Sequence, residues 1–332
     1  MASRSLISLG LPKASLVALT TYGYETIQDL LTAGSPEELS TQLKIPISEV
    51  HKIFASTQKL SAAPAVTLPL TQSAAAMAQP TQKFSTRFSG IDQLLGGGIS
   101  LGQILEISGP PGCPKERVAI NILTSFVEVG EHVIFVDCQN MTSPATISQV
   151  LKETPNMPHN CIQLVRYTKI QTLPELIMFM YKLPSLLASQ PKTTLLILNS
   201  ISFLFQFPRL SIATRNDHFE RIMQSLTKAS ASRNVTVVTT SQLATKVLNA
   251  DGSPGTFDTG GIGVMVPQLG SAYLPTGRTY RIILCPEGPT SGTAKLLASP
   301  SLQLKPGQTT ERQPYSIASP SHLSALSDFY SA

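Results

Sequence analysis

The sequence lacks the features that would mark a membrane or a secreted protein. No uninterrupted apolar stretch approaches the roughly 18 residues that a membrane-spanning helix needs, and no charged-then-apolar secretory pattern opens the chain. The four cysteines show no Cys-x-x-Cys spacing and no nearby histidine, which argues against a zinc site and a disulfide framework. We therefore expect a soluble protein with free thiols in a reducing compartment.

A strong excess of one charge sign is also missing. The formal net charge is +5 over 332 residues, which permits a polyanionic partner without requiring one. The segment before Glu25 has no acidic residue and faintly resembles a mitochondrial targeting peptide, with Arg4 and Lys13 among serines, but a helical domain explains it better. The 42% of hydrophobic residues are enough for a substantial core and about two domains.

A stretch rich in Ala, Pro, Thr and Gln, residues 61–83, has the composition of a linker. Residues 1–60 before it show helical spacing over 16–31 and a predicted capping box from Ser35 to Glu38. This predicted helical domain has five Lys or Arg and five Asp or Glu, so its charge gives no argument for nucleic-acid binding. A small protein-contact domain explains it equally well.

After the linker, apolar strands alternate with helical stretches, which predicts a parallel sheet covered by helices on both faces. In such sheets ligands lie at the carboxyl ends of the strands, so the loops that follow these strands are the candidate site. The predicted strands are ILEIS (104–108), HVIFVDC (132–138), CIQLVR (161–166), TTLLILNS (193–200), NVTVVTTSQ (234–242) and TYRIILC (279–285).

The stretch GPPGCPKE, residues 109–116, directly follows the first of these strands. A phosphate-binding loop needs glycines that let it curl around the anion, backbone N–H groups that cradle it, a lysine for the terminal phosphates and a Ser or Thr for magnesium. Gly109, Gly112 and Lys115 meet this pattern, so a nucleotide site is one interpretation. A plain Gly- and Pro-containing turn is the other.

Two residues depart from the phosphate-loop pattern. Pro114 replaces the glycine before the lysine and removes one N–H, and Glu116 replaces the hydroxyl residue. Both suit the start of a helix, where proline fits and an acid complements the helix dipole. Losing a hydrogen bond to a charged group costs about 1.5–3 kcal/mol, and a carboxylate facing phosphates adds repulsion, so we expect nucleotide affinity to fall by roughly 10-fold to over 100-fold.

The stretch STRFSGIDQLLGGGISLGQILEISGPPG, residues 85–112, resembles the entry into the ATPase core of RecA/RadA-type recombinases. QLATK (242–246) and VPQLG (266–270) resemble motifs of eukaryotic recombinase paralogues, the homologous-recombination mediators, here in a divergent and fungal-type form. The resemblance implies a RecA-like P-loop ATPase core over 84–318, with a mostly parallel twisted sheet and a flexible tail over 319–332. It also implies a helix-hairpin-helix-like N-terminal domain.

The resemblance assigns roles to three polar residues at strand ends. Gln139 stands where the family has a water-activating acid, and glutamine cannot take a proton from water. Asn199 stands at the position of a magnesium-supporting aspartate, so magnesium binding is doubtful. Gln242 keeps the position of the γ-phosphate-sensing glutamine. The expected set for weak ATP binding comprises Gly109, Gly112, Lys115, Glu116 and Asn199.

The family also holds DNA through two loops. Residues 243–270 resemble the second loop, and their Gly, Ser, Thr and Asp content predicts a mobile segment. Lys246 there, with Arg209 and Arg215 near the first loop, forms a small cationic set that would hold single-stranded or branched DNA only weakly. The linker lacks the Phe-x-x-Ala element with which family recombinases dock onto a neighbour, so a hetero-oligomer with a recombinase or paralogue is expected.

We therefore expect a nuclear protein that assists homologous-recombination repair by binding a partner recombinase or paralogue, with an impaired ATP site. Two alternatives remain open. One is a DNA-stimulated ATPase of the same family that works with an unusual phosphate loop. The other is a RecA-fold signalling ATPase unrelated to DNA, which the QLATK stretch and the helical N-terminal domain disfavour.

Overall fold

A computed structural model describes residues 6–31, 35–60, 82–206, 210–249, 253, 255–303 and 311–317. The chain divides into two compact units, Met1–Gln82 and Lys83–Ala332. Most of the predicted linker, residues 61–81, lies outside the described residues, as does the predicted tail. Within the described part of the chain no helix is long and apolar enough to cross a membrane.

The first unit is helical, and its helices pack around a core that includes Leu19, Tyr24 and Leu39. The predicted capping box is confirmed: Glu38 N–H donates to Ser35 Oγ, and Ser35 N–H donates to the Glu38 carboxylate. The elements are the 3-10 helix η1 (Leu6–Leu9), α1 (Lys13–Thr21), α2 (Ile27–Leu31), α3 (Pro36–Leu43) and α4 (Ile47–Leu60).

The second unit is built on a 10-stranded sheet in the order β11-β10-β9-β3-β7-β6-β4-β5, with β12 beside β10 and β8 beside β7. Strands β5, β4, β6, β7, β3 and β9 are parallel, and β10, β11 and β12 extend the sheet in antiparallel fashion. Their bounds are β3 (Ile104–Gly109), β4 (His132–Asp137), β5 (Val165–Lys169), β6 (Thr193–Asn199), β7 (Thr236–Leu248), β8 (Ile262–Pro267), β9 (Thr279–Pro286), β10 (Ser291–Ser299), β11 (Leu302–Gln303) and β12 (Arg312–Ser316).

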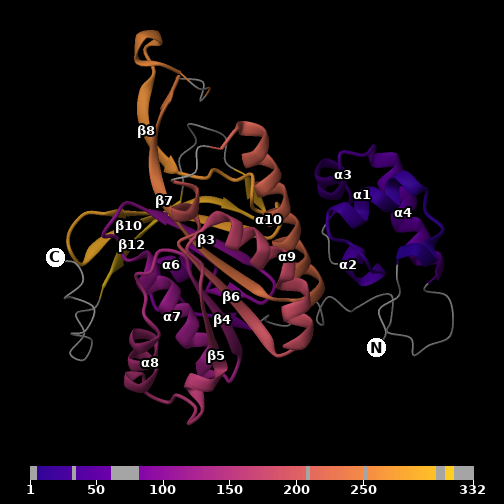
Figure 1. The fold of residues 1–332 in the computed structure, drawn as a ribbon. Coiled ribbons are helices and arrows are strands. Elements are labelled where there is room, and N and C mark those ends of the chain that lie inside the picture. The colour runs from indigo at the N-terminus through magenta and orange to yellow at the C-terminus, as the bar shows by residue number, and fades with distance from the viewer. Residues whose placement is uncertain are drawn as a thin grey trace. The chain divides into compact units, whose positions relative to one another are not determined.

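Helices cover both faces of this sheet, as the alternating pattern predicted (Figure 1). Successive strand residues point to opposite faces, so Phe135 lies in one core cluster and Ile134 in the other. The first cluster packs under α6 (Ser89–Leu94), α7 (Lys115–Glu128) and α8 (Pro144–Glu153), and the second under α9 (Leu173–Ser189) and α10 (Ile212–Arg233). The strands β1 (Lys83–Phe84) and β2 (Ile99–Ser100), which flank α6 in the chain, form a small two-stranded sheet.

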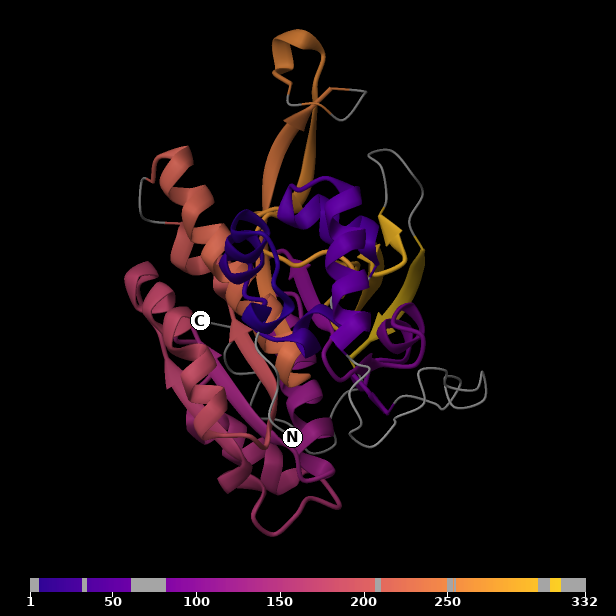
Figure 2. The same ribbon diagram turned by 90° about the vertical axis from the view of Figure 1, so that its right-hand side faces the viewer.

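Two local predictions differ from the structure. The strand predicted over 161–166 begins only at Val165, because Cys161–Leu164 forms the 3-10 helix η2. The segment 243–270 was predicted as a mobile loop, but two parts of it are strands. Residues 243–248 pair with residues 262–267 in an antiparallel ribbon that projects from the sheet (Figure 1, Figure 2). Its apolar and β-branched residues lie in the two strands, and its small and polar residues concentrate between them.

Candidate functional site

The carboxyl ends of the central strands meet at one edge of the sheet. Gly109 of β3 is the register partner of Gln242 in β7, and Asp137 of β4 is the partner of Asn199 in β6. The predicted convergence of the strand-end loops is therefore present. The phosphate-type loop follows β3 at this edge and leads into α7.

Lys115 is folded back onto its own loop. Its Nζ donates to Gly109 O at 3.0 Å, to Pro110 O at 2.6 Å and to Cys113 Sγ at 3.4 Å, and the residue is only 8% exposed. An ammonium group has three hydrogens, and here each has an acceptor within the loop. A phosphate would have to compete with these acceptors for the lysine.

The backbone donors of the loop are equally committed. Three of the six residues 110–115 are prolines without N–H, Cys113 N–H donates to Pro110 O at 3.4 Å, and Lys115 N–H donates to Cys113 O at 2.8 Å. This leaves Gly112, with φ of +78°, as the amide within 110–115 that can turn toward an anion. A phosphate cradle depends on several such donors.

Glu116 turns toward the strand ends from the first turn of α7. Burial raises the pKa of its carboxyl group above the usual value, and a hydrogen bond from Asn199 opposes that rise. The Asp137 carboxylate adds to the rise, whereas Lys115 opposes it. At the position where a phosphate loop has a metal-binding hydroxyl group, this chain therefore places a carboxyl group bonded to a neutral amide.

Asn199 at the end of β6 is fully buried, and it bonds two hydroxyl groups as well as the Glu116 carboxyl group. Its Nδ2 donates to Thr142 Oγ1 at 3.3 Å, and its Oδ1 accepts from Thr240 Oγ1 at 2.6 Å. The described residues contain no group of three or more His, Cys, Asp or Glu side chains that could hold a metal ion. Because Mg²⁺ prefers carboxylate oxygens and water, the neutral Asn199 amide is a weaker magnesium ligand than an aspartate at the same position would be.

Asp137 is a residue that the sequence interpretation did not single out. Its carboxylate accepts from the N–H groups of Gln139 at 3.0 Å, Asn140 at 2.8 Å and Thr142 at 3.1 Å, and from Tyr167 Oη at 3.1 Å. These four hydrogen bonds stabilise the turn after β4, which carries Gln139 at the same edge of the sheet. The sequence signal for this role was an acidic residue at the end of a strand followed by polar residues, a pattern typical of a turn held by an aspartate side chain.

Of the three residues predicted for DNA, the structure describes Arg215 and Lys246. Arg209 lies outside the described residues. The Arg215 guanidinium on α10 lies 5.2 Å from the ring centroid of Phe219, as a cation–π contact, and is half-buried. Lys246 is exposed on the ribbon, opposite Val264.

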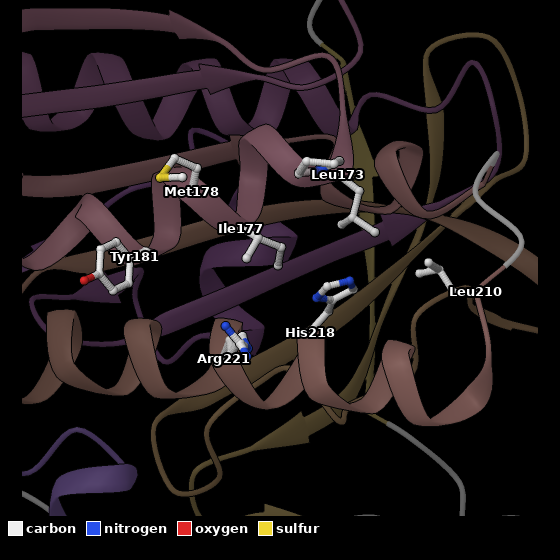
Figure 3. A pocket seen from close by; sticks show the side chains of 8 residues that line it. Leu173, Ile177, Met178, Tyr181, Leu210, His218 and Arg221 are labelled. Atoms are coloured by element: carbon white, nitrogen blue, oxygen red, sulfur yellow. The ribbon is translucent and has the colours of Figure 1, made fainter.

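A second surface feature is an apolar groove between α9 and α10, with a volume of about 580 Å³ (Figure 3). Met178 and Tyr181 on its α9 side are 53% and 81% exposed. His218 and Arg221 line it from α10, and the His218 Nδ1 atom is buried without a hydrogen-bond partner among the described residues. The sequence interpretation did not single out this groove, because packing decides which apolar side chains of a helix stay exposed.

Comparison of the sequence with known proteins gives a matching family and several relatives. The family described as Rad51 matches residues 79–306. The chain is similar to the DNA repair and recombination protein RadB of Methanosphaera stadtmanae, with 28% identity over 47% of this chain and 66% of that protein. It is also similar to DNA repair protein RAD51 homolog 3 of Dictyostelium discoideum, with 25% identity over 59% of this chain and 55% of that protein. Both matches cover less than two thirds of the relative.

A longer match involves RAD51 homolog 3 of Cricetulus griseus, at 23% identity over 74% of this chain and 76% of that protein. The predicted resemblance to recombinases and their paralogues is thus confirmed, and the central sheet with its helices is a RecA-like core. The fungal type stays a prediction.

Proposed function

Because this chain belongs to the Rad51 family, we propose that it assists homologous-recombination DNA repair as a recombinase paralogue with an impaired ATP site. It does so by binding a partner recombinase or paralogue in a hetero-oligomer, in the nucleus. The relatives named for DNA repair support the process, and the geometry of the phosphate-type loop supports the impaired site.

The proposal rests mainly on the hydrogen bonds that the phosphate-type loop makes within itself. Lys115 Nζ already has three acceptors, and within 110–115 only Gly112 keeps an amide for an anion. A nucleotide must break these bonds, and each hydrogen bond to a charged group contributes about 1.5–3 kcal/mol. ATP therefore binds weakly.

The water-activating and metal-supporting positions add to the argument. Asn199 is engaged by Thr142 and Thr240, Glu116 brings a carboxyl group toward the phosphate side, and Gln139 cannot accept a proton from water. The residues present therefore fit a hydrated magnesium ion poorly. Whatever nucleotide binds, we expect hydrolysis to be slow.

The proposed function therefore depends on surfaces that contact a partner or DNA. The helical N-terminal unit and the linker are the first candidates for partner contact, and the exposed apolar side chains Met178 and Tyr181 show that the core also has surface of the kind that protein contacts cover. Arg209, Arg215 and Lys246 are the proposed contacts to single-stranded or branched DNA. With so few cations, DNA binding should be weak and should fall only gradually as salt rises, because the salt dependence scales with the number of phosphates contacted.

The second candidate function is a DNA-stimulated ATPase. It is favoured by one observation: Gln242 lies in register with Gly109, whose carbonyl oxygen accepts a hydrogen bond from the retained Lys115. The test is steady-state ATP hydrolysis by the full chain, with and without single-stranded DNA, against Lys115→Ala. We expect both proteins to show the same rate. Turnover clearly above the Lys115→Ala rate, stimulated by DNA, would establish the ATPase instead.

A further inference from the structure

Gln206 and Gln242 are joined through their side-chain amides. Gln206 immediately follows the 3-10 helix η3 (Ile201–Phe205), and its Nε2 donates to Gln242 Oε1 at 2.6 Å. Gln242 lies where β7 leaves the central sheet and enters the ribbon. The contact therefore links the segment after β6 to the root of the ribbon.

Two backbone hydrogen bonds hold Gln242 at the same point. Its N–H donates to Ser202 Oγ at 2.8 Å, and its carbonyl accepts from Gln268 N–H at 2.9 Å, directly after the second ribbon strand. The residue thus connects η3, β7 and the end of β8 while lying in register with Gly109.

We propose that Gln206 is a positioning residue that holds the Gln242 side chain from within the protein, so that the ribbon keeps its arrangement without nucleotide. The inference rests on the proposed function, in which Gln242 keeps the phosphate-sensing position but the nucleotide site is impaired. Where a nucleotide is bound, its terminal phosphate would order such a glutamine; here a second glutamine does so.

The physical reason is the cost of ordering a long side chain. Fixing a glutamine side chain costs rotamer entropy, which a well-formed hydrogen bond can largely offset. The contact is made of neutral groups, so neither magnesium nor a charged ligand is needed to maintain it. The ribbon surface, including Lys246, is then presented constitutively rather than only in an ATP state.

The experiment is hydrogen–deuterium exchange of the full chain, read over residues 243–248 and 262–267. Gln206→Leu keeps the size but removes the donor, and Gln206→Lys restores a donor of similar reach. We expect Gln206→Leu to accelerate ribbon exchange about two- to tenfold, with Gln206→Lys close to wild type. The matched control is Gln149→Leu, because exposed Gln149 donates a comparable hydrogen bond to Glu153 at 2.9 Å on α8; it should leave ribbon exchange unchanged.

Addition of Mg-ATP should not change ribbon exchange in the wild type. Equal exchange in wild type and Gln206→Leu would overturn the proposal, as would ribbon protection that appears only with Mg-ATP. Melting curves show that each variant is folded. The ATP hydrolysis assay tests the proposed function separately, because turnover above the Lys115→Ala rate would refute the impaired site. The exchange comparison without nucleotide would still test the role of Gln206.

Discussion

Glu106 of β3 and Arg281 of β9 form a buried ion pair across the central sheet, with Arg281 Nε 2.6 Å from Glu106 Oε2. Tyr273 Oη donates to the other carboxylate oxygen at 2.8 Å, and Arg281 Nη2 donates to Gly270 O at 2.9 Å. The pair therefore attaches the segment that follows the ribbon to the strand that carries the phosphate-type loop.

Removing one partner of this pair should be costly. Arg281→Met leaves the fully buried Glu106 carboxylate without its counter-charge, and we expect the free energy of unfolding to fall by about 3–5 kcal/mol in urea titrations. The double variant Glu106→Gln with Arg281→Met should recover part of that loss. The control is Arg87→Met, which breaks the exposed contact to Glu128 and should cost no more than about 1 kcal/mol. Equal losses in the two single variants would contradict the structural role of the buried pair.

Glu116 should make stability depend on pH. Because burial raises its pKa in the folded state, the folded protein keeps the proton to a higher pH than the unfolded chain does. Stability from this group is thus present below the usual glutamate pKa and is lost as pH rises through the folded-state pKa. Glu116→Gln should therefore gain stability relative to wild type as pH rises from 4.5 to 8, measured by urea unfolding. Glu220→Gln, at an exposed carboxylate, is the control, and the same trend there would contradict the assignment.

Restoring the phosphate loop should restore nucleotide binding. The double variant Pro114→Gly with Glu116→Thr returns one amide donor and a hydroxyl group, and we expect ATP affinity to rise roughly 10-fold to 100-fold in calorimetric titration. Pro144→Gly, at the first turn of α8, controls for replacing a proline at a helix start. An unchanged affinity in the double variant would show that these two residues are not what limits binding.

Strand periodicity and turn chemistry predicted the sheet well. The strands around 104–108, 132–138 and 193–200 are present because each buried strand is a short apolar run followed by polar residues. The antiparallel ribbon escaped prediction because the Gly, Ser and Asp residues between its strands outweighed the alternating apolar residues of the strands themselves. The strand predicted to begin at Cys161 begins only at Val165, since a 3-10 turn and a strand start share that composition.

The candidate site was predictable only in part. Motif positions indicated Lys115, Asn199 and Gln242 at one edge, and the strand register brings the latter two to the ends of adjacent strands. The sequence does not reveal that Lys115 bonds its own loop, because that contact depends on the conformation of an irregular segment. It does not reveal that Gln206 reaches Gln242 either, because these two residues are distant in the chain. The exposed apolar groove of α9 and α10 likewise depends on which helix faces remain uncovered.

The central claim is that this chain acts through partner contact rather than through ATP chemistry. The most direct measurement compares survival after DNA damage in cells lacking the endogenous protein and supplied with wild type, Lys115→Ala or a chain without residues 1–60, each tagged for recovery of bound partners. We expect Lys115→Ala to restore survival and keep its partners, whereas the truncated chain should bind fewer partners and restore less. Full rescue by the truncated chain together with failure of Lys115→Ala would contradict the central claim.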